Sequence, residues 1–200
     1  NVFVPPRPHQ RIVLDPIYDV EVDLATSVDH PSPVIRSCGE IACAARAYQR
    51  GEFEDMLRYG RDAERSSIFG SAFWFGSLQV QSWAEYLLGD LEAALRSADR
   101  DLHEAYRFGD RSAMIVPVGI YSLVLGSLGE AEASAIVRGA LPRSLTVMLV
   151  AELPELDVWI KEQIGRDRFA ELRQRGRGMT PRELQALAHD VCAQHFDAKD

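Results

Sequence analysis

The sequence predicts an all-α protein built from about three pairs of antiparallel helices, a C-terminal helical cap and an extended N-terminal arm. The main observation is a pattern that occurs three times: a glycine, then Phe or Leu two residues later, then a small or apolar residue after three more. Gly51, Gly89 and Gly126 begin the three copies, which lie 38 and 37 residues apart. This near-constant period is typical of stacked helical hairpins, because a single hairpin cannot bury its own apolar face.

Small residues recur at fixed distances from these glycines, which is the second observation. Two sets hold equivalent places, seven residues before and nine residues after each glycine: Ala44, Ser82 and Gly119, and then Gly60, Ala98 and Ala135. Small side chains at facing positions let two helices approach closely. We expect each of the three glycines to end the first helix of its hairpin in a left-handed conformation.

The first 35 residues differ from the rest and are expected to form an extended arm or linker. Six of the ten prolines occur here, and proline at this density disfavours helix. Tyr18, Val20, Val22 and Leu24 alternate with acidic residues, which is the period of an extended segment with one buried side.

Residues 36–140 are expected to hold the helical hairpins. Ser66 and Ser67 are candidate caps for a helix over residues 72–88. Gly109 and Asp110 take the same role for a helix that runs to residue 125, and Pro117 is expected to kink or split that helix. The third hairpin is therefore predicted to be the least regular.

Residues 141–200 are predicted to form a helical cap that departs from the repeat. Prolines and glycines divide its first part into expected helices over residues 144–153, 155–164 and 167–175, the last ending at Gly176 or Gly178. Thr180, Pro181 and Glu183 then form a capping-box sequence, with threonine at the cap, proline in the first turn and glutamate three residues after the threonine. A final helix is predicted to follow.

Charge and composition narrow the function classes. The formal net charge of -8 disfavours nucleic-acid binding. No apolar run approaches the ~20 residues that span a bilayer, so no membrane partner is expected. The three cysteines form no even framework or metal motif, which favours a reduced, cytoplasmic protein. The chain begins with Asn1 rather than methionine, and we expect it to be part of a longer or processed protein.

Sequence motifs for catalysis or cofactor binding are weak, and we expect no cofactor, no metal and no catalytic residue. The turn Gly176-Arg177-Gly178 lacks the lysine and later glycine of a phosphate-binding loop. His189, Cys192 and His195 diverge around a helix, because steps of three residues drift by about 60° each. The acidic pairs Asp99/Asp101 and Glu130/Glu132 are expected on solvated helix faces.

Aromatic residues are densest between residues 69 and 86. Their simplest interpretation is core between neighbouring hairpins. The alternative is that Trp74 or Phe75 lies in a binding groove or at a dimer contact, because aromatic side chains concentrate at such contacts.

The stretch from residue 161 to residue 182 is basic in an otherwise acidic chain. It holds seven Lys and Arg against three Asp and Glu. Without interleaved aromatic residues it does not match a nucleic-acid surface. We interpret it as a solvated face or as a docking surface for an acidic partner domain.

Four segments carry a resemblance to a known family. Residues 165–172 (GRDRFAEL) and 175–184 (RGRGMTPREL) resemble the closing segment of LuxR-type and cyclase-linked STAND ATPase regulators of bacteria. Residues 86–94 (YLLGDLEAA) and 107–111 (RFGDR) are similar to the tetratricopeptide-like repeats of those proteins. The resemblance covers roughly residues 36–195 and implies tetratricopeptide-like hairpins. The family's ATPase, cyclase and DNA-binding activities belong to modules that these residues do not match.

These observations together predict a non-catalytic protein-interaction or sensor module of a bacterial signalling or transcriptional regulator. A peptide, a partner helix, an inducer or another domain of a parent chain would bind in a concave groove formed by the first helices of the hairpins. The candidate groove residues are Arg46, Gln49, Gln79, Tyr86 and Tyr121. Two alternatives stay open: a structural oligomerisation domain, such as a homodimer formed through Trp74, and a helical enzyme or small-ligand-binding protein with a closed pocket.

Overall fold

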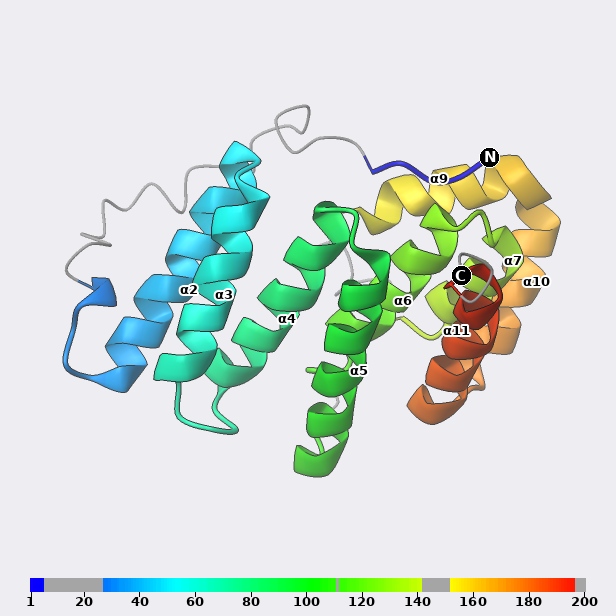
Figure 1. Cartoon of the computed structure of the whole chain (residues 1–200). Coiled ribbons are helices and arrows are strands. Elements are labelled where there is room, and N and C mark those ends of the chain that lie inside the picture. The colour runs from blue at the N-terminus through cyan, green and yellow to red at the C-terminus, as the bar shows by residue number, and fades with distance from the viewer. Residues whose placement is uncertain (6–26, 111, 142–151, 197–200) are drawn as a thin grey trace. The chain divides into compact units, whose positions relative to one another are not determined.

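A computed structural model describes residues 1–5, 27–110, 112–141 and 152–196. The regular secondary structure of these ranges is helical, which confirms the predicted all-α class (Figure 1). Within the same ranges, none of the helices combines the length and hydrophobicity that a bilayer-spanning segment needs. The expected alternation at residues 18–24 and most of the expected helix at residues 144–153 lie outside the described residues.

The chain divides into two compact units, and the division falls inside one helix. The N-terminal unit (residues 6–97) holds α2 (Pro33–Arg50), α3 (Phe53–Ser66), α4 (Ala72–Leu87) and the first turns of α5 (Leu91–Phe108). The C-terminal unit (residues 1–5 and 98–200) holds the rest of α5, α6 (Ile115–Ser127), α7 (Ala131–Gly139), α9 (Leu153–Ile164), α10 (Arg166–Arg177) and α11 (Pro181–Phe196). The division thus lies within α5, whereas the sequence pattern places boundaries at residues 35 and 140.

Glycines in the left-handed conformation end α2, α4 and α6 through one hydrogen-bond pattern. Gly51, Gly89 and Gly129 have φ values of 73°, 83° and 86°. Each donates its N–H to the carbonyl three residues back, and the next N–H reaches the carbonyl five residues behind it. Gly109 closes α5 in the same way. This Schellman geometry satisfies carbonyls that a helix end leaves free, and glycine adopts it without steric cost.

The third repeat glycine of the sequence pattern is not the one that makes the turn. Gly126 lies inside α6, and the turn is made by Gly129, 40 residues after Gly89. A Cβ at Gly126 would lie 2.6 Å from Leu156 Cδ1 and 3.4 Å from Phe3 Cβ. The N–H of Phe3 also donates to the Gly126 carbonyl at 2.9 Å. The position of Gly126 therefore has no room for a side chain, because α9 and the first residues of the chain pack directly on it.

The corrected register places a serine pair at the crossing of α6 and α7. Ser122, seven residues before Gly129, takes the place that Ala44 and Ser82 hold in the earlier copies. Its hydroxyl donates to the Ser134 carbonyl at 3.1 Å, and the Ser134 hydroxyl donates to the Ser122 carbonyl at 2.8 Å. Both side chains are fully buried, so small residues let α6 and α7 approach closely at this point. The position nine residues after Gly129 is held by Arg138 rather than by a small residue, so the second predicted set does not extend to this copy.

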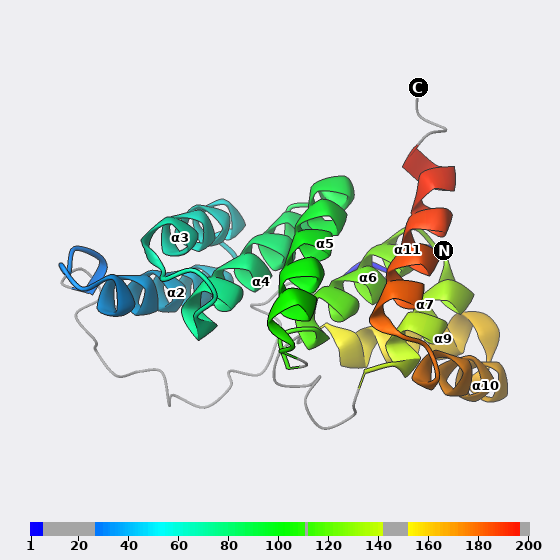
Figure 2. The same ribbon diagram turned by 90° about the horizontal axis from the view of Figure 1, so that it is seen from below.

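Small and large side chains pack together in the core of the N-terminal unit. Ala44 and Ala47 of α2, Met56 of α3 and Ala84 of α4 make one buried cluster. The helices α2 and α3 lie side by side along their lengths (Figures 1 and 2). α3 also approaches α4 closely, because a Cβ at Gly60 would lie 2.8 Å from a methyl group of Val80.

The C-terminal unit is built around α6, which is buried on every side. All residues from Ile115 to Gly126 are buried, and α7, α9 and α11 pack on this helix. α7 in turn lies against α10 (Figure 2). Their backbones touch: a Cβ at Gly139 would lie 2.2 Å from the Arg173 carbonyl oxygen, and one at Gly176 would lie 1.8 Å from that of Ile136.

Helix boundaries confirm one predicted signal, correct two others and decide between the two predicted ends of α10. Thr180 Oγ1 accepts the N–H of Glu183 at 3.3 Å, and Glu183 Oε2 accepts the N–H of Thr180 at 2.7 Å, so the capping box forms. α4 is capped by Ser71 rather than by Ser66 or Ser67. Pro117 lies in the first turn of α6, where it breaks no intrahelical bond. α10 continues through Gly176 and ends at Gly178.

Candidate functional site

The five expected groove residues divide into exposed and buried positions. Arg46 and Gln49 are exposed on α2, and Gln79 is half-buried on α4. Tyr86 is 3% exposed and Tyr121 is fully buried. The two tyrosines therefore offer almost no surface to a partner and belong to the interior of their units. Arg46, Gln49 and Gln79 are at least partly accessible to a partner, as the groove hypothesis requires.

The aromatic stretch contributes mainly to the core. Trp74 and Phe75 are 4% and 5% exposed, and their ring centroids lie 5.2 Å apart. Burial of both favours the core interpretation over the alternative that one of them lies in a groove or at a dimer contact. Two neighbours are exposed instead: Ile68 at 54% and Phe69 at 59%, in the loop between α3 and α4.

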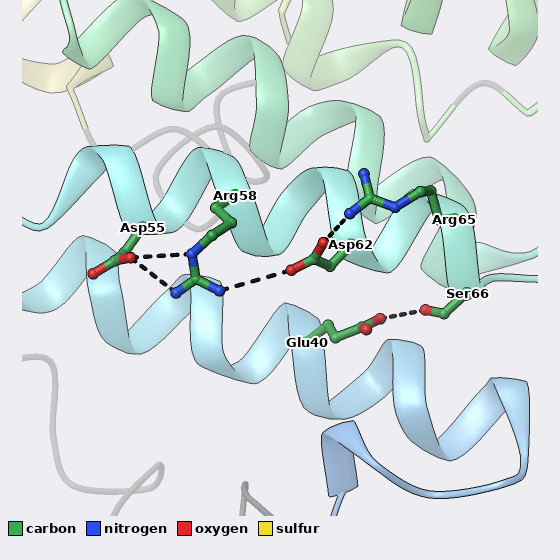
Figure 3. A network of polar contacts seen from close by, with 6 residues as sticks. All are labelled: Glu40, Asp55, Arg58, Asp62, Arg65 and Ser66. Carbon is green, nitrogen blue, oxygen red and sulfur yellow. Dashed lines mark hydrogen bonds and ion pairs between the residues drawn. The ribbon is translucent and has the colours of Figure 1, made fainter.

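One hollow lies on α3 and is lined by Glu54, Leu57, Arg58, Arg61, Asp62, Arg65 and Leu88. Its arginines pair with carboxylates in the lining or beside it, and a further polar contact joins α3 to α2. Arg58 donates to Asp55 at 2.8 Å, Arg65 pairs with Asp62, and Glu40 of α2 accepts a hydrogen bond from Ser66 (Figure 3). The α3 pairs are exposed and three or four residues apart, where each contributes about 0.3–0.5 kcal/mol. This arrangement is typical of a solvated helix face, so the α3 hollow is a weak candidate for a site.

A larger hollow, of about 1090 Å³, lies on the C-terminal unit and is predominantly basic. We call it the basic hollow. It is lined by α9, α10 and one residue of α7: Arg138, Pro154, Asp157, Val158, Lys161, Glu162, Arg166, Phe169, Ala170, Arg173, Gln174 and Arg177. Five of these residues are cationic and two are acidic. It contains the first part of the basic stretch that the sequence singles out, together with Arg138, which the sequence does not associate with it.

A cluster of polar side chains joins α11 to α5 and α6 within the C-terminal unit. Asp99 Oδ1 accepts the Tyr121 hydroxyl at 2.6 Å and the Gln185 amide at 3.1 Å. The other carboxylate oxygen lies 2.6 Å from His189 Nε2. Burial, followed by the negative charge of Asp99, raises the pKa of Tyr121, so this hydroxyl stays protonated and acts as a donor.

The Asp99–His189 pair has the geometry of an oriented general base, but the thiol of Cys192, three residues further along α11, is unsuited to nucleophilic attack. Burial and the negative charges of Asp99 and Glu130 raise the pKa of Cys192 to about 11. Such a thiol is protonated near neutral pH and is a poor nucleophile. His195, further along α11, lies 2.8 Å from Glu130 rather than beside His189. The cluster is therefore best explained as a set of tertiary hydrogen bonds that hold α11 on α5 and α6, which we call the clasp.

We expect Asp99→Asn to lower the free energy of unfolding by about 1–3 kcal/mol, because the three donors around it lose a charged acceptor. Urea unfolding of the variant and the wild type measures the difference. Asp190→Asn, on the outer side of α11, is the control. Equal stability of all three proteins would show that the clasp does not stabilise the fold.

Asp101 of α5 is unusual because it is a carboxylate in the interior of the C-terminal unit. Its side chain is fully buried, and neither carboxylate oxygen has a hydrogen-bond partner among the described residues. Burial, followed by the charge of Asp110, raises the pKa of Asp101 to about 8. This corrects the expectation of a solvated face for Asp101. Asp99 is half-buried, whereas Glu130 and Glu132 pair at the surface with His195 and Arg168.

The described ranges contain no group of three or more His, Cys, Asp or Glu side chains that could hold a metal ion. Comparison of the chain with family models, with curated proteins and with solved structures gives no match.

Proposed function

We propose that this chain is a non-catalytic protein-interaction module built from tetratricopeptide-like hairpins. The observation that carries the proposal is the common geometry of the turns at Gly51, Gly89 and Gly129, each followed by an acidic residue and then by a new helix. Repeated helical pairs of this kind generally present extended surfaces for partners. The proline-rich first 35 residues would serve as an arm or linker.

The resemblance to bacterial STAND regulators supports a more specific role. In such a parent protein, capture of a ligand by the helical region would shift the equilibrium between closed and open states of an ATPase. We propose a cytoplasmic sensor or adaptor role of this kind. The ATPase itself would belong to another part of the parent protein.

The surface we propose for the partner is the exposed side of α2 around Arg46 and Gln49, extended by Gln79 of α4. α2 and α4 are the first helices of their hairpins and contact each other. A peptide or a partner helix would lie across these side chains.

Photo-crosslinking tests this surface. A benzophenone amino acid placed at Arg46 or Gln49 is expected to capture the same partner in cells of the source organism. The same group at Gln194, exposed on α11, is the control and is expected to capture none. Absence of a product at both α2 positions, or equal capture at Gln194, would contradict the proposal.

A structural oligomerisation domain is the second candidate, favoured by the exposure of Ile68 and Phe69. Light scattering after size exclusion would then give a mass above the 22.3 kDa of one chain, and Phe69→Ser would restore the single-chain mass. Trp74→Ala is unsuitable here because Trp74 is buried. A wild-type protein that elutes as a single chain removes this candidate.

A further inference from the structure

The basic hollow carries an unbalanced charge. Its five cations (Arg138, Lys161, Arg166, Arg173 and Arg177) face only two acids, Asp157 and Glu162. Asp157 is already engaged, because its Oδ1 lies 2.8 Å from Arg138 Nε. The lining of the α3 hollow is closer to balance, because its three arginines are accompanied by two acids, Glu54 and Asp62. The excess positive charge thus distinguishes the basic hollow from an ordinary solvated face.

Arg138 gives this hollow a buried donor that lacks an acceptor. The residue is 4% exposed. Its Nη2 donates to Asp157 Oδ2 at 3.2 Å, but its Nη1 has no hydrogen-bond partner among the described residues. Unsatisfied buried donors are rare in folded proteins because they lose the hydrogen bonds that water provided. A ligand with a carboxylate oxygen would supply the missing acceptor.

An aromatic ring positions two further cations at the hollow. Lys161 Nζ lies 5.0 Å from the centroid of the Phe169 ring, and the Arg173 guanidinium carbon lies 5.5 Å from it. Arg173 is 6% exposed, so a second guanidinium is held close to the protein interior. Cations fixed by a ring and by packing lose less side-chain entropy when they bind an anion.

We propose that the basic hollow binds an acidic peptide segment of a partner protein or of another domain. Carboxylates match the unsatisfied Nη1 of Arg138 and the exposed guanidinium groups of Arg166 and Arg177, because arginine forms charge-assisted hydrogen bonds with carboxylates. The lining also includes Pro154 and Val158, the latter 55% exposed, which suit apolar side chains between the acids. Nucleic acid fits less well, because the chain carries a net charge of -8.

Fluorescence anisotropy with a labelled peptide tests the proposal on the full chain. The probe is Glu-Glu-Leu repeated three times, and the control peptide has glutamine in place of every glutamate. The wild type is expected to bind the glutamate peptide at least tenfold more tightly than the glutamine peptide. The double variant Arg166→Glu/Arg177→Glu, at two exposed positions of the hollow, is expected to weaken binding at least tenfold.

The matched control is Arg175→Glu/Arg182→Glu, which makes the same change of charge at exposed positions outside the lining. It is expected to weaken binding less than threefold. Equal weakening by both double variants, or equal affinity for the two peptides, would overturn the proposal. The proposal would also be overturned if oligothymidylate displaced the peptide at a lower concentration of charged groups than polyglutamate does. The site would then prefer phosphates to carboxylates. These outcomes do not depend on the α2 surface, which the crosslinking experiment tests separately.

Discussion

Asp101→Asn is expected to raise the free energy of unfolding at pH 7 by about 4 kcal/mol. The folded protein holds the pKa of Asp101 at about 8, against an ordinary value of 3.8, and a tenfold difference in acidity between the folded and unfolded states corresponds to about 1.4 kcal/mol. Between pH 3.8 and about pH 8, the folded state binds more protons at Asp101 than the unfolded state does. The contribution of the site to stability is therefore complete below about pH 4 and is lost as the pH rises through 8.

Urea unfolding of the wild type and Asp101→Asn at several pH values between 5 and 8 measures this effect. The advantage of the variant should increase steadily over that range, because asparagine does not ionise. Asp190→Asn on the outer side of α11 is the control. A difference in stability that does not change with pH would mean that Asp101 ionises in the folded protein as easily as in the unfolded chain.

Gly176→Ala is expected to lower the free energy of unfolding by about 3 kcal/mol or more. The new methyl group would lie 1.8 Å from the Ile136 carbonyl oxygen and close to the Cα of Gly139. Both neighbours are backbone of α7, which cannot move aside as a flexible side chain can. Overpacking of this kind typically costs about 1–3 kcal/mol, and backbone contact places the cost at the upper end.

Gly178→Ala provides a matched control two residues away. Gly178 has φ -88°, and the nearest atom to an added Cβ is the Arg175 carbonyl oxygen at 3.7 Å. Thermal unfolding should therefore be nearly unchanged for Gly178→Ala and strongly lowered for Gly176→Ala. Similar melting of the two variants would show that α7 and α10 are not packed backbone to backbone.

Local signals in the sequence predicted much of the fold, because a few neighbouring residues determine the backbone conformation at a cap or a turn. The capping box at Thr180 and the left-handed glycines at positions 51 and 89 depend on a few neighbouring residues, and each forms as predicted. Gly126 fits the pattern through Leu128, whereas Gly129 has Ala131 at that place and resembles the other two turns only through the acidic residue that follows it, Glu130. The packing of Phe3 and Leu156 on Gly126 explains why a glycine also stands there, and this contact could not be predicted from neighbouring residues.

The surface features depended on contacts between distant segments and were predicted less well. Asp99 joins His189, which is 90 residues away, and Arg138 joins Asp157 across a segment that interrupts the repeat. One signal for Asp101 was present in the sequence: it follows Ala98 by three residues and precedes Ala105 by four. This spacing places its carboxylate in the apolar stripe of α5, where both alanines are fully buried.

Whether this chain works by docking a partner on its helices is tested most directly by hydrogen exchange. Exchange of backbone amides would be followed by mass spectrometry on the purified chain, with and without the glutamate–leucine peptide. Docking at the basic hollow predicts slower exchange in α9 and α10, with little change in α2 and α3. Identical exchange along the whole chain at a peptide concentration that saturates anisotropy would contradict it.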